Sequence, residues 1–328
     1  MKKNNKVIWI AWERHRRTLE IADFLNIDPV IFEDKLPRLI RHTLNVFKTL
    51  AIIQRRKPKV LIVQNPSIVL TFIACLLHPV YRYALIVDSH NAGIIPESHL
   101  LKKLGFLYRY FQRNANVMVV TNDALAQIVE KNSGNPFILP DRIPQPHATE
   151  KIRLKGRYNI AYICTFKRDE PFQEVIEAVR SLDSDVVVYI TGNHKYCPPH
   201  IFTNMTDNIV LTGFLSEEEY WNLLSSVDLI IDLTLRENCL VCGAYEAVTL
   251  ECPMILSDTK ALKSHFSKGV IFTRSGVTAI VDAVKKGLAQ QAELRREISA
   301  LKRELIDKWN VTGKQLKDYI YQEENCSL

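Results

Sequence analysis

A regular alternation of short apolar runs with longer segments of helical periodicity constrains the fold of this chain most. In the first half, runs such as "KVIWIAW" (6–12), "KVLIVQ" (59–64) and "RYALIVDS" (82–89) are apolar over the length of a strand. Strands of this kind, separated by helices, are typical of a parallel sheet covered on both faces. We predict strands at 6–12, 29–33, 59–64, 82–89, 115–121 and 136–140, and helices at 16–25, 37–56, 66–77, 100–114 and 122–132.

The second half repeats this alternation after a segment of mixed charge with two prolines, "DRIPQPHATEKIRLKGR" (141–157), which is typical of a linker. Ser216 and Glu219 have the spacing of a helix capping box. The predicted strands are 158–166, 185–192, 208–214, 228–233, 253–258 and 269–273, and the predicted helices are 170–182, 216–227, 243–251 and 277–288.

The whole pattern predicts an α/β protein with two Rossmann-like domains and a charged, helical C-terminal tail. We place the first domain at 1–148, the second at 149–300 and the tail at 301–328. Ligands of open α/β sheets bind beyond the carboxyl ends of the strands. We therefore expect the two domains to face each other across a cleft that holds the functional site.

Glycine-rich phosphate loops are missing from the turns where a dinucleotide or P-loop enzyme needs them. The turn after the first strand reads "WIAWERHRRT" and the corresponding turn of the second domain reads "ICTFKRDEPF", both without glycine. Residues 1–150 hold only Gly93, Gly105 and Gly134. This disfavours NAD, FAD and P-loop chemistry.

The stretch "TLRENCLVCGAYEAV" (234–248) joins a buried strand to a helix and carries two glutamates. The start of a helix offers backbone N–H groups and a positive dipole end, which together suit a diphosphate. Glu246 has the position to accept hydrogen bonds from a ribose, and Glu237 from a hexose. The backbone expected to cradle the diphosphate is that of Leu240, Val241, Cys242 and Gly243.

The segment from "VLTGFLSEEEYWNLL" to "EAVTLECPMILSD" (210–258) resembles the donor-binding half of GT-B glycosyltransferases, especially glycosyltransferase family 4. The family pattern is E-x7-E followed by E-A-x-A-x-G-x-P. Here Glu237 lies one residue too far from Glu246, which puts Asn238 in the first position, and Cys252 replaces the glycine. The match is therefore stronger for Glu246 than for Glu237.

The first half is similar to the N-terminal domain of the β-1,4-mannosyltransferases of lipid-linked oligosaccharide assembly. The similarity lies in "LIVQNPSIVLTFIACLL", "ALIVDSHN" and "NDALAQIVEKNSGNPFILPDRIP". Together the resemblances imply transfer of a hexose from a UDP- or GDP-sugar to a polyprenyl-linked or other glycan acceptor, without a cofactor or an obligatory metal. They point to surface polysaccharide or glycan assembly.

Residues that end strands of the second domain complete the predicted donor site. Lys167 and Arg168 follow its first strand, where a cation can offset the departing diphosphate; an ordinary solvated loop is the alternative. Turns at the ends of two further strands border the nucleobase by resemblance, although simple turn chemistry also explains them. They contain Gly192, Asn193, Gly213, Phe214 and Leu215.

The first domain is expected to supply the acceptor site and a general base. Candidate bases are Glu13 and His15 after the first strand, and Asp88 and His90 in "DSHN" after another. His90 is as readily explained as a structural turn residue. The arginines of "WERHRR" are expected to hold an acceptor phosphate, with a basic helix start as the alternative; they are Arg14, Arg16 and Arg17.

Basic charge is concentrated in the first half of the chain. Residues 1–150 hold 21 Lys and Arg against 12 Asp and Glu, whereas residues 151–328 hold 22 against 24. The helices 37–56 and 100–114 mix basic, aromatic and aliphatic residues, and no apolar run approaches the roughly 18 residues that span a bilayer. We predict a cytoplasmic protein on the inner face of an anionic membrane, and no nucleic-acid partner.

Seven cysteines, an odd number, indicate reduced thiols, and the CxxC of Cys239 and Cys242 is read as small apolar lining of a loop. Two other functions stay open from the sequence. One is a sugar-nucleotide epimerase of the same architecture, and the other is a non-catalytic nucleotide- or glycan-binding subunit.

Overall fold

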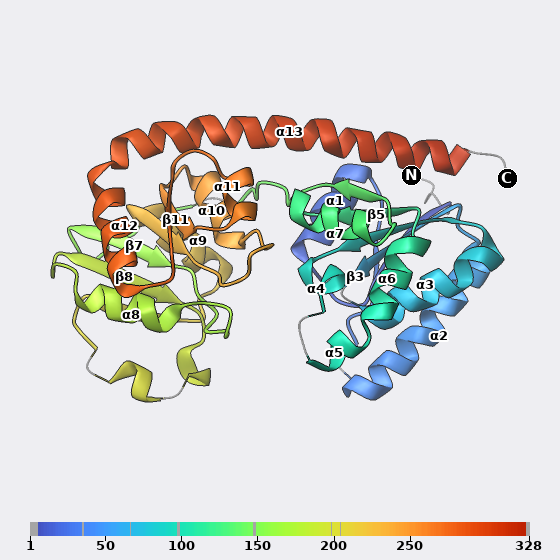
Figure 1. Cartoon of the computed structure of the whole chain (residues 1–328), viewed down its shortest axis with the longest axis horizontal. Helices are drawn as coiled ribbons and strands as arrows, with labels where there is room; N and C mark the ends of the chain where they lie inside the picture. The colour runs from blue at the N-terminus through green and yellow to red at the C-terminus, as the bar shows by residue number, and fades with distance from the viewer. Residues whose placement is uncertain are drawn as a thin grey trace. The chain divides into compact units, whose positions relative to one another are not determined.

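The computed structural model describes residues 6–34, 36–65, 67–96, 99–146, 149–197, 199–203 and 205–325. It divides into two compact units: unit 1 comprises Met1–Arg142 with Lys308–Leu328, and unit 2 comprises Ile143–Asp307. Each unit contains a six-stranded sheet whose neighbouring strands are all parallel (Figure 1). The α/β class and the two Rossmann-like sheets predicted from the sequence are confirmed.

Unit 1 has the strand order β2-β1-β3-β4-β5-β6. Its strands are β1 (Val7–Ala11), β2 (Val30–Ile31), β3 (Val60–Asn65), β4 (Ala84–Ser89), β5 (Val117–Val120) and β6 (Pro136–Ile138). Its helices are α1 (Arg16–Leu25), α2 (Arg38–Arg56), α3 (Ile68–Tyr81), α4 (Asn91–Ile94), α5 (His99–Lys103), α6 (Gly105–Asn114) and α7 (Asp123–Lys131).

Strand β1 shows why the apolar runs become central strands. Val7 and Trp9 belong to the cluster that packs with α1 and the end of the last helix, whereas Ile8 and Ile10 belong to the cluster under α2, α3 and α6. Successive side chains of a strand point to opposite faces, so a strand covered on both faces must be apolar throughout.

Unit 2 has the strand order β12-β11-β10-β7-β8-β9. Its strands are β7 (Tyr158–Tyr162), β8 (Val186–Thr191), β9 (Ile209–Gly213), β10 (Leu229–Asp232), β11 (Met254–Ser257) and β12 (Val270–Thr273). Its helical segments are α8 (Phe172–Arg180), η1 (His194–Tyr196), η2 (Pro199–Phe202), α9 (Glu217–Ser226), α10 (Cys242–Leu250), α11 (Lys260–His265), α12 (Val277–Ala289) and the start of α13 (Gln291–Asn325). The predicted capping box of Ser216 and Glu219 is present at the start of α9.

Each strand order reverses direction at one place, and that place locates the ligand-binding edge. In unit 2 the chain runs outward from β7 to β8 and β9 and then returns to the other side of β7 with β10. In unit 1 the corresponding reversal separates β1 from β3. Ligands of open α/β sheets bind beyond the carboxyl ends of the strands at such a reversal.

Three local features differ from the sequence prediction. The single helix expected at 100–114 is two helices, α5 and α6, which meet at Leu104 and Gly105; glycine is a poor helix former. The short helices α4 and α11 and the two 3₁₀ segments η1 and η2 were not predicted. Such short elements carry too few residues for a recognisable period.

The boundary between the units falls at Arg142 and Ile143, near the start of the expected linker. Residues 301–325 of the expected tail belong to one long helix, α13, which begins in unit 2 and contributes its residues from Lys308 onward to unit 1. Among the described residues, no helix is both long and apolar enough to cross a lipid bilayer.

Candidate functional site

The loops after β7 and β10 lie at the reversal point of the unit 2 sheet and are joined to each other. The backbone N–H of Leu235 donates to the carbonyl of Asp169 at 2.7 Å, and Arg236 Nε lies 2.8 Å from Asp169 Oδ2. The two loops carry Lys167 and Arg168 on one side and the 234–243 segment on the other. The structure thus brings these predicted donor residues to one edge of the sheet.

The start of α10 is shaped by a residue that the sequence reading missed, Asp232 at the end of β10. Its Oδ2 accepts the backbone N–H of Gly243 at 2.8 Å. A β-carbon at position 243 would lie 2.5 Å from this oxygen and 2.5 Å from Ile163 Cδ1. Gly243 is therefore required by close packing, and its N–H is already engaged by the protein itself.

Asp232 is a buried carboxyl that holds its proton more strongly than an exposed aspartate does. Burial raises its pKa well above the ordinary range, and Glu246 and Glu170 add to this effect, although the hydrogen bond from Gly243 opposes it. A neutral carboxylic acid still accepts the N–H of Gly243 and does not repel a nearby anion. The signal for Asp232 in the sequence was an acidic residue ending an otherwise apolar strand, "DLIID".

Glu246 is buried in the second turn of α10 and is held by another residue that the sequence did not reveal. The hydroxyl of Tyr220, on α9, donates to Glu246 Oε2 at 2.6 Å. Burial, followed by Glu246, raises the pKa of this tyrosine, so it stays a hydrogen-bond donor. Tyr220 and Glu246 are 26 residues apart, and only the packing of α9 on α10 brings them together. Glu237, by contrast, is exposed on the loop.

The loop after β7 is folded around Glu170. The carboxylate of Glu170 accepts the N–H of Thr165 at 2.9 Å, the hydroxyl of Thr165 at 2.7 Å and the N–H of Lys167 at 3.1 Å. This arrangement supports Phe166 in the left-handed region at φ 58°. The side chains of Lys167 and Arg168 are exposed.

The turns after β8 and β9 are also at the carboxyl edge of this sheet. Gly192 has φ 93°, and a β-carbon there would lie 2.1 Å from the carbonyl oxygen of Cys164. The side chain of Asn193 accepts the N–H of Lys195, which is turn chemistry. Gly213 also has a positive φ, 73°, and next to it Phe214 is 89% exposed while Leu215 packs against the core. An exposed phenylalanine ring at this edge is suited to stacking on a base.

The cysteines of unit 2 differ in their surroundings. Cys239 is partly exposed and Cys242 is exposed, whereas Cys252 is buried, with its thiol 3.7 Å from the carbonyl of Val227. Cys326 lies outside the described residues.

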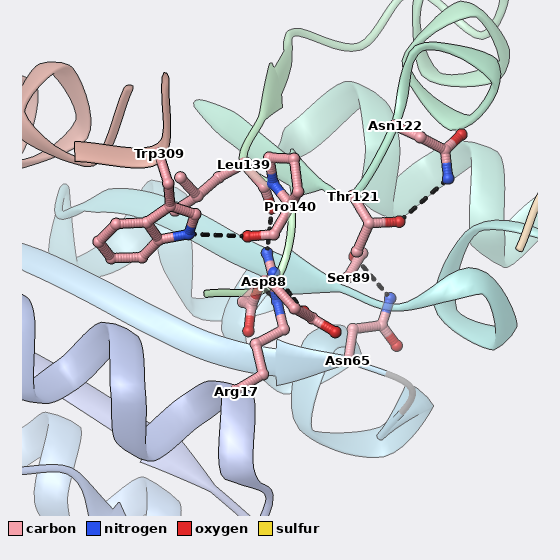
Figure 2. A network of polar contacts seen from close by, with 10 residues as sticks. Arg17, Asn65, Asp88, Ser89, Thr121, Asn122, Leu139, Pro140 and Trp309 are labelled. Carbon is pink, nitrogen blue, oxygen red and sulfur yellow. Dashed lines mark hydrogen bonds and ion pairs between the residues drawn. The ribbon is translucent and has the colours of Figure 1, made fainter. Parts of the chain in front are cut away.

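In unit 1, Arg17 has a role different from the expected one. Its guanidinium donates to Asp88 at 2.9 Å, to Asp141 at 2.7 Å and to the carbonyl of Leu139 at 2.8 Å (Figure 2). The residue is only 2% exposed. A buried guanidinium whose three nitrogens each donate to the protein is not accessible to an acceptor phosphate, so the prediction for Arg17 is corrected.

The electrostatics of this cluster are those of a structural ion network. Burial alone would lower the pKa of Arg17, but Asp88 and Asp141 raise it above the ordinary value. Burial alone would raise the pKa of Asp141, but Arg17 brings it below the ordinary value, with help from His90 and His15. Asp88, expected as a possible base, is buried in this network, where its Oδ1 accepts from Arg17.

The histidines expected as alternative bases lie against each other. The rings of His15, which precedes α1, and His90, which precedes α4, have centroids 4.4 Å apart at 61°. Burial lowers the pKa of His90, although Asp88 opposes this effect. Buried polar atoms normally have partners. Within the described residues, however, His15 Nδ1, His90 Nε2 and Asp88 Oδ2 have none. Glu13, Arg14 and Arg16 are exposed.

The part of α13 that belongs to unit 1 also holds the segment next to this network. Trp309, on the part of α13 that belongs to unit 1, donates its indole N–H to the carbonyl of Pro140 at 3.0 Å, as Figure 2 shows. The guanidinium of Arg142 lies 5.2 Å from the centre of the Trp309 ring. The segment 139–142 is therefore held by Arg17 through Leu139 and Asp141, and by Trp309.

No protein-family model and no curated protein matches this sequence. Solved structures do match its fold. Sucrose-phosphate synthase from Thermosynechococcus elongatus has a TM-score of 0.75 at 12% identity, covering 96% of this chain and 98% of that chain. HepE from Anabaena, solved in complex with UDP and glucose, has a TM-score of 0.74 at 10% identity, covering 96% and 99%. A protein assigned as a UDP-N-acetylglucosamine 2-epimerase from Listeria monocytogenes has a TM-score of 0.60 at 11% identity, covering 89% and 91%. With two parallel sheets, flanking helices and a long C-terminal helix, the chain has the GT-B fold.

Proposed function

We propose that this chain is a glycosyltransferase that moves a hexose from a UDP- or GDP-sugar to a lipid-linked saccharide. The observation that carries the proposal is the carboxyl edge of the unit 2 sheet. The joined loops after β7 and β10 carry exposed cations, α10 carries Glu246 anchored by Tyr220, and the exposed ring of Phe214 follows β9. A neighbour of the same fold, HepE, has been solved with UDP-glucose. The sequence pattern around Glu246 supports the same donor class.

In this proposal Glu246, which Tyr220 holds, accepts ribose hydroxyls, and the exposed ring of Phe214 stacks on the base. Lys167 and Arg168, which are exposed at this edge, are the proposed partners of the diphosphate. The nucleotide sugar is a co-substrate, and the proposed transfer needs no metal or other cofactor.

Unit 1 supplies the acceptor side of the proposed reaction. In a direct displacement, the acceptor hydroxyl oxygen forms a bond to the anomeric carbon while the bond from that carbon to the diphosphate oxygen breaks. The nucleoside diphosphate leaves with the electron pair, and the hydroxyl proton passes to a base. His90 suits this role because burial lowers its pKa and keeps the imidazole neutral. His15 lies against it, Glu13 is an exposed alternative, and Arg14 and Arg16 remain the candidates for an acceptor phosphate.

The donor claim is tested by thermal unfolding with a panel of UDP- and GDP-sugars. A ligand at 100 times its Kd stabilises the native state by about 2.7 kcal/mol. We expect at least one sugar nucleotide to raise the melting temperature, and Glu246→Gln to abolish that rise. The matched control is Glu218→Gln, an exposed glutamate in the first turn of α9, which should leave it intact. The donor site is refuted if no sugar nucleotide stabilises the protein at millimolar concentration.

The acceptor claim is tested separately with a radiolabelled sugar nucleotide and a polyprenyl-linked saccharide. Label should move into the organic phase in the presence of a chelator, and His90→Gln should prevent this without changing the donor-induced thermal shift. Label that stays in the aqueous phase while the donor still binds would contradict the lipid-linked acceptor. It would leave open surface polysaccharide or glycan assembly through a water-soluble acceptor.

A sugar-nucleotide epimerase is the second candidate, because the Listeria protein shares the fold. Incubation with the donor alone distinguishes the two functions. An epimerase returns a sugar nucleotide with an inverted centre, whereas a transferase returns the donor unchanged or slowly hydrolysed.

A further inference from the structure

Helix α3 has two apolar faces, and only one is covered. Its residues Leu70, Ile73 and Ala74 pack into the core of unit 1. A second stripe at intervals of three, four and four residues is exposed, with Val80 at 71%. Side chains three and four residues apart are neighbours on a helix surface, so these side chains form one continuous strip. The exposed stripe consists of Val69, Phe72, Leu76 and Val80.

The neighbouring helices also carry exposed apolar side chains. Helix α3 packs against both α2 and α6, as Figure 1 also shows, and the rings of Phe72 and Tyr110 are 6.5 Å apart. On α2, Leu39 is 83% and Phe47 65% exposed. We call the exposed apolar side chains of the three helices the α2–α3–α6 face; they are Leu39, Ile40, Phe47, Val69, Phe72, Leu76, Val80 and Phe106. Soluble proteins rarely leave a large contiguous apolar surface without a partner.

The helices α2, α3 and α6 themselves carry no acidic side chain. The sequence contains no Asp or Glu from position 36 to 87 or from 99 to 122. On α2, burial, followed by the positive charges of Arg38 and Arg41, lowers the pKa of His42. Within the described residues, Lys48 is the one cation of α2 that forms an ion pair. Its partner, Asp34, precedes the helix. The basic residues of α2 and α6 are Arg38, Arg41, Lys48, Arg55, Arg56, Arg109 and Arg113, and Lys102 and Lys103 lie on α5, which contacts α6.

We propose that the α2–α3–α6 face docks on an anionic lipid bilayer, with its apolar side chains entering the headgroup region and its basic side chains on lipid phosphates. Apolar side chains flanked by Lys and Arg are typical of helices that lie in the plane of a membrane interface. The absence of acidic residues matches a surface of uniform negative charge, since protein partners usually present both signs. The inference rests on the proposed function, because it names the surface by which the enzyme would reach a lipid-linked acceptor.

Co-sedimentation of the full chain with vesicles tests the proposal. We expect binding to vesicles of phosphatidylcholine mixed with phosphatidylglycerol, weak binding to phosphatidylcholine alone, and a decrease with salt. Replacing Leu76 and Val80 by Ser should weaken binding by roughly tenfold or more for each side chain. The control is Val311→Ser, which removes a valine of α13 whose exposure, 61%, lies between those of Leu76 and Val80.

A second variant tests the electrostatic part. Lys102→Gln with Lys103→Gln should weaken binding to anionic vesicles about 30-fold, since each basic residue contributes about a fivefold factor. Unchanged circular dichroism and melting temperature show that each variant is folded. Binding that Leu76 and Val80 do not affect overturns the proposal. So does a shift from dimer to monomer in these variants without a change in vesicle binding, because the face would then join two copies.

The donor assay separates this inference from the proposed function. If the protein binds a sugar nucleotide but no vesicle, the donor site is supported and the membrane surface is contradicted. If the protein binds vesicles through this face but binds no sugar nucleotide, the membrane surface is supported and the proposed function is contradicted.

Discussion

Replacing Arg17 by Met is the sharpest test of the unit 1 network. The change removes hydrogen bonds of 2.9 Å to Asp88, 2.7 Å to Asp141 and 2.8 Å to the carbonyl of Leu139. Methionine fills much of the space, so the loss is mainly electrostatic. Breaking a buried ion pair by removing one partner costs about 3–5 kcal/mol, because the other charge stays buried and uncompensated. We expect a loss of this size in the free energy of unfolding of unit 1.

The neighbouring Arg16 supplies the matched control. Arg16 is exposed, and its Nε lies 3.5 Å from Glu20 Oε1, four residues along the helix. Such pairs contribute about 0.3–0.5 kcal/mol. Urea unfolding followed by the fluorescence of the tryptophans should therefore show a large shift for Arg17→Met and almost none for Arg16→Met. Equal shifts for the two variants would refute the reasoning.

The pH dependence adds an independent check. In the native protein the pKa of Asp141 is lowered, so its contribution is present above the ordinary aspartate pKa and is lost as the pH falls through the lower folded value. Without Arg17, burial is opposed only by the effects of His90 and His15, and the pKa of Asp141 should rise. The penalty in the variant is then present at neutral pH and fades as the carboxyl takes up its proton. The difference between the two proteins should shrink on acidification from pH 7 toward about 4.

Three further outcomes follow from the contacts. Gly243→Ala should destabilise the protein by about 1–3 kcal/mol in thermal unfolding, because its β-carbon would lie 2.5 Å from a carboxyl oxygen, whereas Gly105→Ala, with no neighbour closer than 3.7 Å, should not. Tyr220→Phe should weaken nucleotide-sugar binding about fivefold by calorimetry while leaving the protein folded, since it removes one hydrogen bond from Glu246. His90→Gln should lower kcat about 10²–10⁴-fold if this residue is the base. Because burial lowers the pKa of His90, the midpoint of the acidic limb of the wild-type kcat/KM profile should then lie at a pH below the ordinary histidine pKa of about 6.5.

Local patterns in the sequence were enough for the two sheets. A strand buried on both faces must be apolar along its whole length. Such a run can be recognised in the sequence without knowing which strands lie beside it. Short-range chemistry was equally readable, as the capping box of Ser216 and Glu219 shows. The break between α5 and α6 at Gly105 was missed because the helical spacing continues on both sides of it.

The contacts around the candidate site depend on packing that no local pattern encodes. Tyr220 and Glu246 meet only because α9 packs on α10. Arg17 is the instructive exception, since helical spacing could have identified it. Arg17, Ile21 and Leu25 recur every four residues and share the buried face of α1. An arginine in that stripe needs buried carboxylates, and Asp88 and Asp141 provide them.

The contacts also change which groups would balance the charge of a diphosphate in unit 2. The sequence suggested backbone N–H groups at the start of α10, but Asp232 engages the N–H of Gly243, and Glu170 engages those of Thr165 and Lys167. An N–H that already donates to a carboxyl oxygen contributes less to a second anion. In the proposed site, part of the negative charge of the donor is then balanced by side chains, and Lys167 and Arg168 are exposed at this edge. Side-chain cations on a loop are screened by salt more than a buried helix end is. Donor binding should accordingly weaken with ionic strength more than a site built on backbone alone would.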